Sequence, residues 1–165
     1  MSDNVFQQTN KKLETLSSQV GFDVPIESIS LPSRGLVYGN DHPFANTEEA
    51  EITAMRAVHE DILSSRALIK KGTVISELLK SCILNKLVDV DTLLIGDRNA
   101  LLIGIRVSGY GSEYSVQIEC ADCGDKFDNN FSLNNLAIKR LGVDPVSPGQ
   151  NLFNFHLPVS KRDIQ

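Results

Sequence analysis

The chain has 165 residues and a formal net charge of −5, with 41% hydrophobic and 22% charged residues and no tryptophan. This length is enough for one compact domain with its own core, and the composition is that of a globular protein with an aliphatic interior. The acidic balance argues against nucleic-acid binding through a broad basic surface, because neutralising phosphates requires a local excess of lysine and arginine. We therefore expect no nucleic-acid partner.

No part of the sequence has the features of a membrane or secretory segment. The polar residues 1–10 lack the apolar stretch of a signal peptide, and no run approaches the ~18 apolar residues that span a bilayer. The three cysteines, an odd number, fit a reducing compartment better than a disulfide framework. We expect no membrane partner and a protein that stays in the cytoplasm where it is made.

Composition shifts divide the chain into four segments. Residues 1–23 are polar and predict a flexible N-terminal arm that orders only against a partner. Residues 24–45 predict an extended Pro/Gly-rich segment lying over other elements, since proline and glycine break helix and sheet. Residues 46–141 predict the main α+β domain, and residues 142–165 a C-terminal loop and strand.

The helical periodicity predicts a small core of about three helices. After a stretch at 48–55 that fits either a helix start or a short strand, one helix is predicted from His59 to Gly72. A second begins after Thr73, with an apolar stripe at helical spacing. A third runs from Asn99 through Val107, with Asp97 as its cap. It is apolar nearly all round, so a buried strand is the alternative.

Strict alternation predicts an antiparallel hairpin over residues 113–132. Tyr114, Val116 and Ile118 alternate with polar residues, and the aromatic-rich residues 127–131 return as the partner strand. The turn between them carries the motif Cys-x-x-Cys-Gly at 120–124. A short helix at 133–141 and a strand at 152–158 complete the prediction. The fold class is α+β, a helical core with a C-terminal antiparallel β-hairpin that bears a CxxC tip.

Cys120 and Cys123 are the candidate metal ligands. Such a turn directs two thiolates at one point, as in half of a zinc ribbon, but a structural zinc site takes four ligands and no second pair follows in this sequence. Three interpretations remain: zinc bound within the chain, a knuckle with free thiols, or a site completed by another copy or another protein. Thioredoxin-like chemistry is disfavoured because the pair lies in a hairpin rather than at a helix N-terminus.

No catalytic constellation stands out, so we expect a protein that is not an enzyme. His42, His59 and His156 are far apart in sequence, and none lies in a nucleophile motif. His59, followed by two acidic residues, is interpreted as part of a solvated helix face. A glycine-rich phosphate loop is also missing.

Three segments together resemble the T4-type baseplate hub assembly family of contractile-tailed phages. They are Leu-Pro-Ser-Arg-Gly-Leu at 31–36, Gly-Asp-Arg at 96–98 with the leucines 101 and 102, and residues 110–124 from Tyr-Gly to the CxxCG motif. The resemblance implies a phage protein made in the host cytoplasm that helps to build, or becomes part of, the baseplate hub of the virion. Its partners would be other baseplate or hub proteins.

Four residues in these segments are the interface candidates. Gly35 permits backbone angles that other residues avoid, so with Arg34 it is expected to shape a turn. Asp97 is expected to cap a helix, and Arg98 to pair with a carboxylate or carbonyl at an interface. Two other classes of function stay open: a zinc-ribbon-like nucleic-acid-binding regulator and a small hydrolase.

Overall fold

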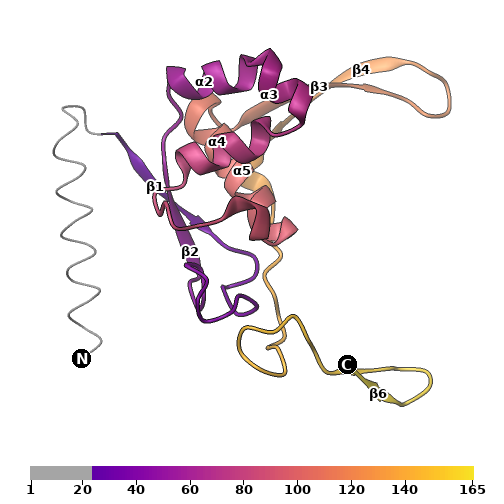
Figure 1. The fold of residues 1–165 in the computed structure, drawn as a ribbon. Helices are drawn as coiled ribbons and strands as arrows, with labels where there is room; N and C mark the ends of the chain where they lie inside the picture. The colour runs from indigo at the N-terminus through magenta and orange to yellow at the C-terminus, as the bar shows by residue number, and fades with distance from the viewer. Residues whose placement is uncertain (1–23) are drawn as a thin grey trace.

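The computed structural model describes residues 24–165 and has the predicted α+β class, with four α-helices and three two-stranded antiparallel sheets in that range. The arm predicted over residues 1–23 lies outside the described residues. The elements, in chain order (Figure 1), are β1 (Ile26–Ser30), β2 (Glu49–Thr53), α2 (Ala57–Ser64), α3 (Arg66–Lys71), α4 (Val74–Cys82), η1 (Val90–Thr92), α5 (Ile95–Tyr110), β3 (Glu113–Glu119), β4 (Lys126–Ser132), η2 (Leu133–Asn135), β5 (Phe155–His156) and β6 (Asp163–Ile164).

The first sheet pairs β1 with β2 in antiparallel register, from Ile26 opposite Thr53 to Ser30 opposite Glu49. This resolves the helix-or-strand alternative at 48–55 in favour of a strand, whose alternate residues Ala50 and Ile52 are buried. The prediction of an extended segment over 24–45 missed β1. A short strand between two prolines gains its structure from its partner rather than from its own sequence pattern.

The helical region follows the predicted order with two corrections. The helix expected from His59 to Gly72 is two helices, α2 and α3, interrupted at the extended Ser65, and α3 ends at the left-handed Gly72 (φ 72°) as predicted. The apolar segment around residues 99–107 is a helix and not a strand. However, α5 already begins at Ile95, with Leu94 as its N-cap residue, so Asp97 lies inside the first turn and does not cap it.

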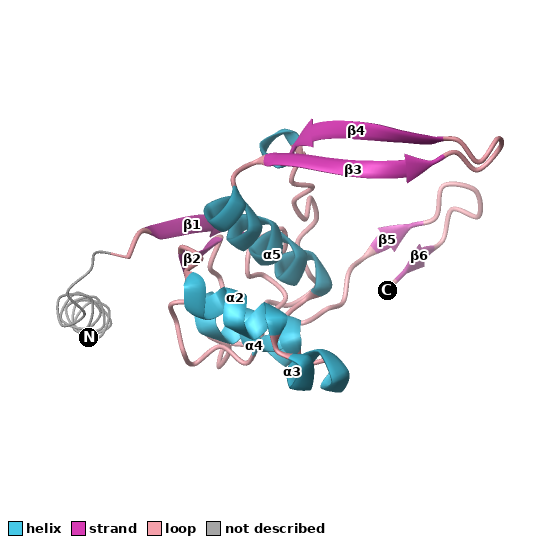
Figure 2. Ribbon diagram, turned by 90° about the horizontal axis from the view of Figure 1, so that it is seen from above, coloured by secondary structure: helices cyan, strands magenta, loops and turns pink. Residues whose placement is uncertain are grey.

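The hydrophobic core lies between the β1–β2 sheet and helices α2, α4 and α5 (Figure 2). The segment 31–44 contributes Leu31, Tyr38 and Phe44 to it, so this Pro/Gly-rich stretch is part of the core. His59 is also fully buried, and the expectation of a solvated helix face for it was wrong. It lies at the third position of α2, where its ring turns back over the helix start.

Beyond α5 the chain forms two hairpins. The predicted hairpin is confirmed: β3 and β4 pair from Glu113 opposite Ser132 to Glu119 opposite Lys126, and they extend well beyond the helices in both views (Figures 1 and 2). The helix expected at 133–141 is only the short 3₁₀ turn η2, and the strand expected at 152–158 is reduced to β5, paired with β6. Among the described helices, none has the length and apolarity to cross a bilayer.

Candidate interaction surfaces

A buried carboxylate joins the Leu-Pro-Ser-Arg-Gly segment to helix α5. Asp97, fully buried, accepts hydrogen bonds from the backbone N–H of Ser33 (2.9 Å), the hydroxyl of Ser33 (2.5 Å) and the hydroxyl of Tyr38 (2.7 Å). The Tyr38 oxygen in turn accepts from the backbone N–H of Leu94 (3.1 Å). Burial raises the pKa of Tyr38 above its ordinary value, so its hydroxyl keeps the proton that it donates. We name Ser33, Tyr38 and Asp97 the Asp97 clamp.

The turn that follows Ser33 has two consecutive left-handed residues, Arg34 (φ 55°) and Gly35 (φ 69°). The Gly35 N–H donates to the Ser33 hydroxyl oxygen (3.0 Å), and its carbonyl accepts from the N–H of Asn46 (2.9 Å). A β-carbon at position 35 would lie 2.3 Å from the backbone nitrogen of Thr47. Glycine is therefore required both by the backbone angle and by the close approach of another chain segment, in agreement with the predicted turn.

Arg34 lies on the surface, half-buried, in a network of ion pairs. Its guanidinium lies 3.4 Å from a Glu48 carboxylate oxygen and 3.8 Å from one of Asp144, and Arg140 approaches Glu48 at 3.9 Å. Arg140 also donates to the Ser30 hydroxyl (3.0 Å). The network therefore joins the segment around residue 140 to the turn and to β1, while Arg34 keeps a solvent-exposed side.

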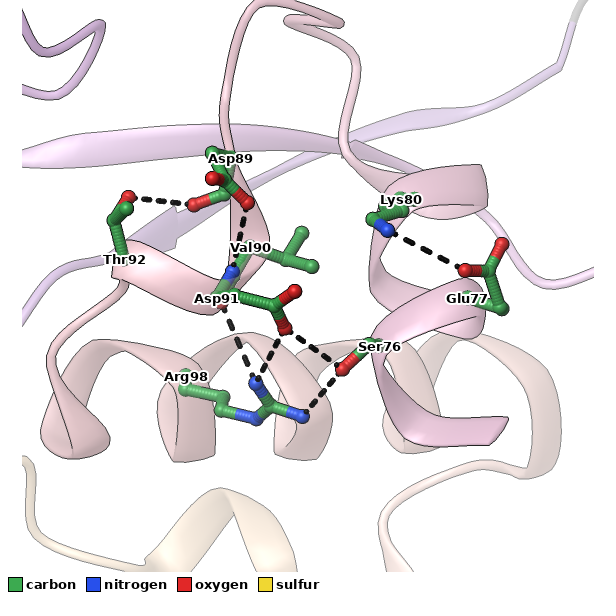
Figure 3. Close-up of polar contacts among 8 residues, drawn as sticks. All are labelled: Ser76, Glu77, Lys80, Asp89, Val90, Asp91, Thr92 and Arg98. Atoms are coloured by element: carbon green, nitrogen blue, oxygen red, sulfur yellow. Dashed lines mark hydrogen bonds and ion pairs between the residues drawn. The ribbon is translucent and has the colours of Figure 1, made fainter. Parts of the chain in front are cut away.

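Arg98 pairs with other residues of the same chain (Figure 3). One terminal nitrogen donates to the Ser76 hydroxyl (3.1 Å), and the other lies 3.4 Å from the Val90 carbonyl oxygen and 4.0 Å from Asp91. These contacts tie α5 to α4 and η1. The guanidinium thus has a carboxylate and a carbonyl as partners, the types expected from the sequence, but both belong to this chain.

An open apolar groove of about 460 Å³ runs between β1, one side of α5 and the segment 133–139. Its floor comes from Gly104, where an added β-carbon would lie 2.4 Å from Ile29 of β1, and from Ile103, which is half-exposed. Because Leu31 donates to Glu48 across the sheet (2.8 Å), the alternation directs the backbone groups of Ser28 and Ser30 toward the outer edge of β1. That edge pairs with no strand among residues 24–165.

One apolar face of the β3–β4 hairpin is exposed in the part of the chain that the structure describes, residues 24–165. Cross-strand pairing places Tyr114 opposite Phe131 and Ile118 opposite Phe127, and all four are exposed. In the two strands only Val116 and Ser132, the last residue of β4, are partly covered. The hairpin base is anchored by Arg106, whose guanidinium lies 5.8 Å from the Tyr114 ring centroid.

The turn of this hairpin carries the cysteine pair as predicted. The Cys120 N–H donates to the Asp125 carbonyl (2.8 Å), the Gly124 N–H donates to the Cys120 carbonyl (2.9 Å), and Gly124 is left-handed (φ 75°). The backbone N–H of Cys123, with that of Asp122, lowers the pKa of the Cys120 thiol, because hydrogen bonds to sulfur favour the thiolate. Both cysteines are free.

The other ligand candidates do not join this turn. Cys82 is buried in the core, where burial raises its pKa, and His59 is buried in α2. His156 pairs with Asp163 (2.8 Å) in the last hairpin. Within residues 24–165 no three His, Cys, Asp or Glu side chains come together in a way that would hold a metal ion. Within residues 24–165, one copy of the chain therefore supplies two thiols at this turn, those of Cys120 and Cys123.

Of the four predicted interface residues, the structure brings Arg34, Gly35 and Asp97 into one connected region and places Arg98 on the side facing α4. Sequence reasoning missed Ser33 and Tyr38, the partners of Asp97. Their separations from Asp97 are 64 and 59 residues, which no local pattern reveals. The signal that was available is the polar serine between Pro32 and Arg34 beside a core leucine.

The chain is similar to one family of known proteins. Residues 42–161 match the family model described as T4 bacteriophage base plate protein. Neither the curated proteins nor the solved structures contain a match. The matched region covers α2 to α5, the cysteine hairpin and most of the C-terminal segment. The chain therefore belongs to the T4 bacteriophage base plate protein family.

Proposed function

We propose that the chain is a non-enzymatic structural or assembly protein of the central hub of a contractile phage tail baseplate, acting through contacts with other baseplate proteins. The family match over residues 42–161 is the observation that carries this proposal. In this proposal the protein is made in the host cytoplasm, where it helps to build the baseplate or becomes part of it. The hub is proposed because the segments at 31–36, 96–98 and 110–124 resemble those of the T4-type baseplate hub assembly family.

The exposed surfaces support a role based on protein contacts. The groove beside β1 combines an apolar floor with a strand edge that pairs with no other strand of residues 24–165, a combination that accepts an extended segment by strand addition. The hairpin presents aromatic residues on a projecting ribbon, and aromatic residues are enriched at interfaces. In this proposal residues 46–141 form the main domain, flanked by residues 24–45 and 142–165.

The Asp97 clamp supports the proposal in a different way. Its three residues are buried, so its role is to hold the turn at Arg34 and the start of α5 in a fixed position relative to each other. Arg34 and the groove then lie on a preorganised scaffold, which lowers the ordering cost of binding. Gly35 and Arg98 serve the same scaffold, through the turn and through α4.

Affinity purification of the tagged protein from infected cells, followed by mass spectrometry, tests the proposal. Recovery of central hub proteins at levels above wedge proteins is the expected result. Recovery of wedge proteins alone would place the chain elsewhere in the baseplate, and recovery of nucleic acid or of no phage protein would refute the proposal.

Surface variants make the same experiment specific. Ile103→Asp in the groove and Phe127→Asp on the hairpin each introduce a charge. The two residues are 37% and 52% exposed, so the fold should persist. Val159→Asp, at a residue 93% exposed in the C-terminal hairpin, is the matched control. At least one of the first two variants should lose the hub proteins that the control retains. Equal recovery with all three variants would contradict a role for these surfaces.

A further inference from the structure

The cysteine pair lies at the end of the apolar face of the β3–β4 hairpin. Side chains alternate along a strand, so Tyr114, Val116 and Ile118 share one face, and Cys120 is the next residue on it. The alternation holds at this position because Cys120 still pairs with Asp125, one step beyond the last residues of β3 and β4. A partner that covers the apolar face therefore also reaches Cys120.

The charges of the two strands lie on the opposite face. Glu113 and Glu119 of β3, with Lys126 and Asp128 of β4, occupy the alternate positions. Packing one hairpin on another through the apolar faces would thus bury no charged strand residue, and a buried unpaired charge is what usually prevents such contacts. Asp125 in the turn lies on the apolar side, with its carboxylate 3.4 Å from the Cys123 thiol, but it is exposed to solvent at the end of the hairpin.

The number of ligands that a zinc ion requires indicates which partner completes the site. A structural zinc ion takes four ligands in a tetrahedral arrangement, and thiolates are among its preferred donors. The turn supplies Cys120 and Cys123, and among residues 24–165 they are not part of any group of three donors that could hold a metal ion. Two-fold symmetry duplicates every group, so two copies of this turn supply four thiolates.

We propose that two copies of this chain associate through the apolar faces of their β3–β4 hairpins and bind one zinc ion with the four cysteines at the two tips. A two-fold axis parallel to the hairpins brings both tips to the same end, with the faces about 10 Å apart as in packed sheets. The hairpin extends beyond the helices, which leaves its tip accessible to a second copy (Figure 1). Covering the face also explains how an otherwise isolated two-stranded ribbon becomes stable.

Metal titration of the purified full chain tests this inference independently of the hub proposal, because it needs no baseplate protein. The chain is kept reduced and freed of metal, Zn²⁺ is added, and bound metal and molar mass are measured together by metal analysis and light scattering. One zinc per two chains with a doubling of mass is expected. Co²⁺ in its place should give the intense thiolate charge-transfer and tetrahedral absorption bands of four-sulfur coordination.

Variants separate the thiols from the apolar face. Cys120→Ser combined with Cys123→Ser should lose both zinc and dimer, whereas Cys82→Ala, in the core, should retain them. Ile118→Ser on the apolar face should weaken zinc-dependent dimerisation at least about tenfold, a loss of one buried side chain per copy, and Gln117→Ser on the polar face should leave it unchanged. Circular dichroism confirms that each variant is folded.

Three outcomes would overturn the inference. They are failure of the reduced chain to retain zinc, one zinc bound per monomer, and zinc-dependent dimers that survive the double cysteine substitution. A dimer insensitive to Ile118→Ser would equally remove the apolar face from the proposal. A baseplate pull-down that fails while the zinc dimer forms would count against the hub role alone.

Discussion

Replacement of Asp97 by alanine tests whether the buried clamp holds the fold together. The change removes the acceptor of three hydrogen bonds and leaves the Ser33 N–H, the Ser33 hydroxyl and the Tyr38 hydroxyl without their partner. Hydrogen bonds to a charged group contribute about 1.5–3 kcal/mol each, and a buried donor left unpaired costs about 1–3 kcal/mol. These terms overlap, because the two hydroxyls can rotate and water can enter the space of the lost carboxylate.

We therefore expect Asp97→Ala to lower the free energy of unfolding by about 3–5 kcal/mol, which is less than the sum of three separate hydrogen bonds to a carboxylate. Asp97→Asn keeps the shape but turns an N–H₂ group toward donors, so its loss should lie between that of alanine and zero. Asp91→Ala is the control. That carboxylate, 66% exposed, lies 4.0 Å from Arg98, and its removal should cost about 0–1 kcal/mol.

Urea unfolding followed by far-ultraviolet circular dichroism measures these differences. With a slope of about 1–3 kcal/mol per molar urea for a domain of this size, Asp97→Ala should lower the midpoint by about 2 M. If its loss is no larger than that of Asp91→Ala, the clamp does not stabilise the fold, and the relation between the turn and α5 is set by apolar packing instead.

Two further substitutions test the turn and the buried histidine. Gly35→Ala should lower the free energy of unfolding in urea by more than about 2 kcal/mol, because the added β-carbon would overlap Thr47. The control is Gly72→Ala, at a residue that is equally left-handed (φ 72°) but in open space, and it should cost only about 1 kcal/mol. Equal losses for the two variants would contradict this explanation. Burial lowers the pKa of His59, so below about pH 6.5 the unfolded chain binds a proton that the native state refuses, and stability falls with pH by up to about 1.4 kcal/mol per unit. His59→Asn, which keeps an acceptor near Nδ1, should make that slope shallower between pH 6.5 and 5, and an unchanged slope would assign the pH dependence to other groups.

Periodic signals predicted the elements that depend on local pattern. The i, i+3, i+4 stripe of α4 and the alternation of β3 and β4 are properties of contiguous residues, and both elements are found where the sequence placed them. The left-handed stop at Gly72 is also local. In these segments the side chain that decides the structure lies within a turn or a strand pair of the residue it affects.

The misses are residues whose roles are decided by distant partners. Asp97 has the composition of a helix cap, yet its carboxylate is taken by Ser33 and Tyr38, and α5 begins two residues before it. His59 stands beside two acidic residues, yet its Nδ1 accepts from the Arg56 N–H (2.9 Å) and its ring is enclosed by the core. Both contacts depend on tertiary packing, which overrides local propensity.

Helix α5 connects the turn at Arg34 to the β3–β4 hairpin that carries the cysteines. Its first turn carries Asp97, and its C-terminal half carries Arg106, which donates to the Gly111 carbonyl (3.0 Å) and lies over the Tyr110 ring (4.8 Å from its centroid). The left-handed Gly111 (φ 77°) then directs the chain into β3. One helix thus sets the position of the turn at Arg34 at one end and the direction of the cysteine hairpin at the other. Because a helix is stiff over this length, a partner bound at the groove beside α5 and a second copy bound at the hairpin would be held in a fixed relation to each other.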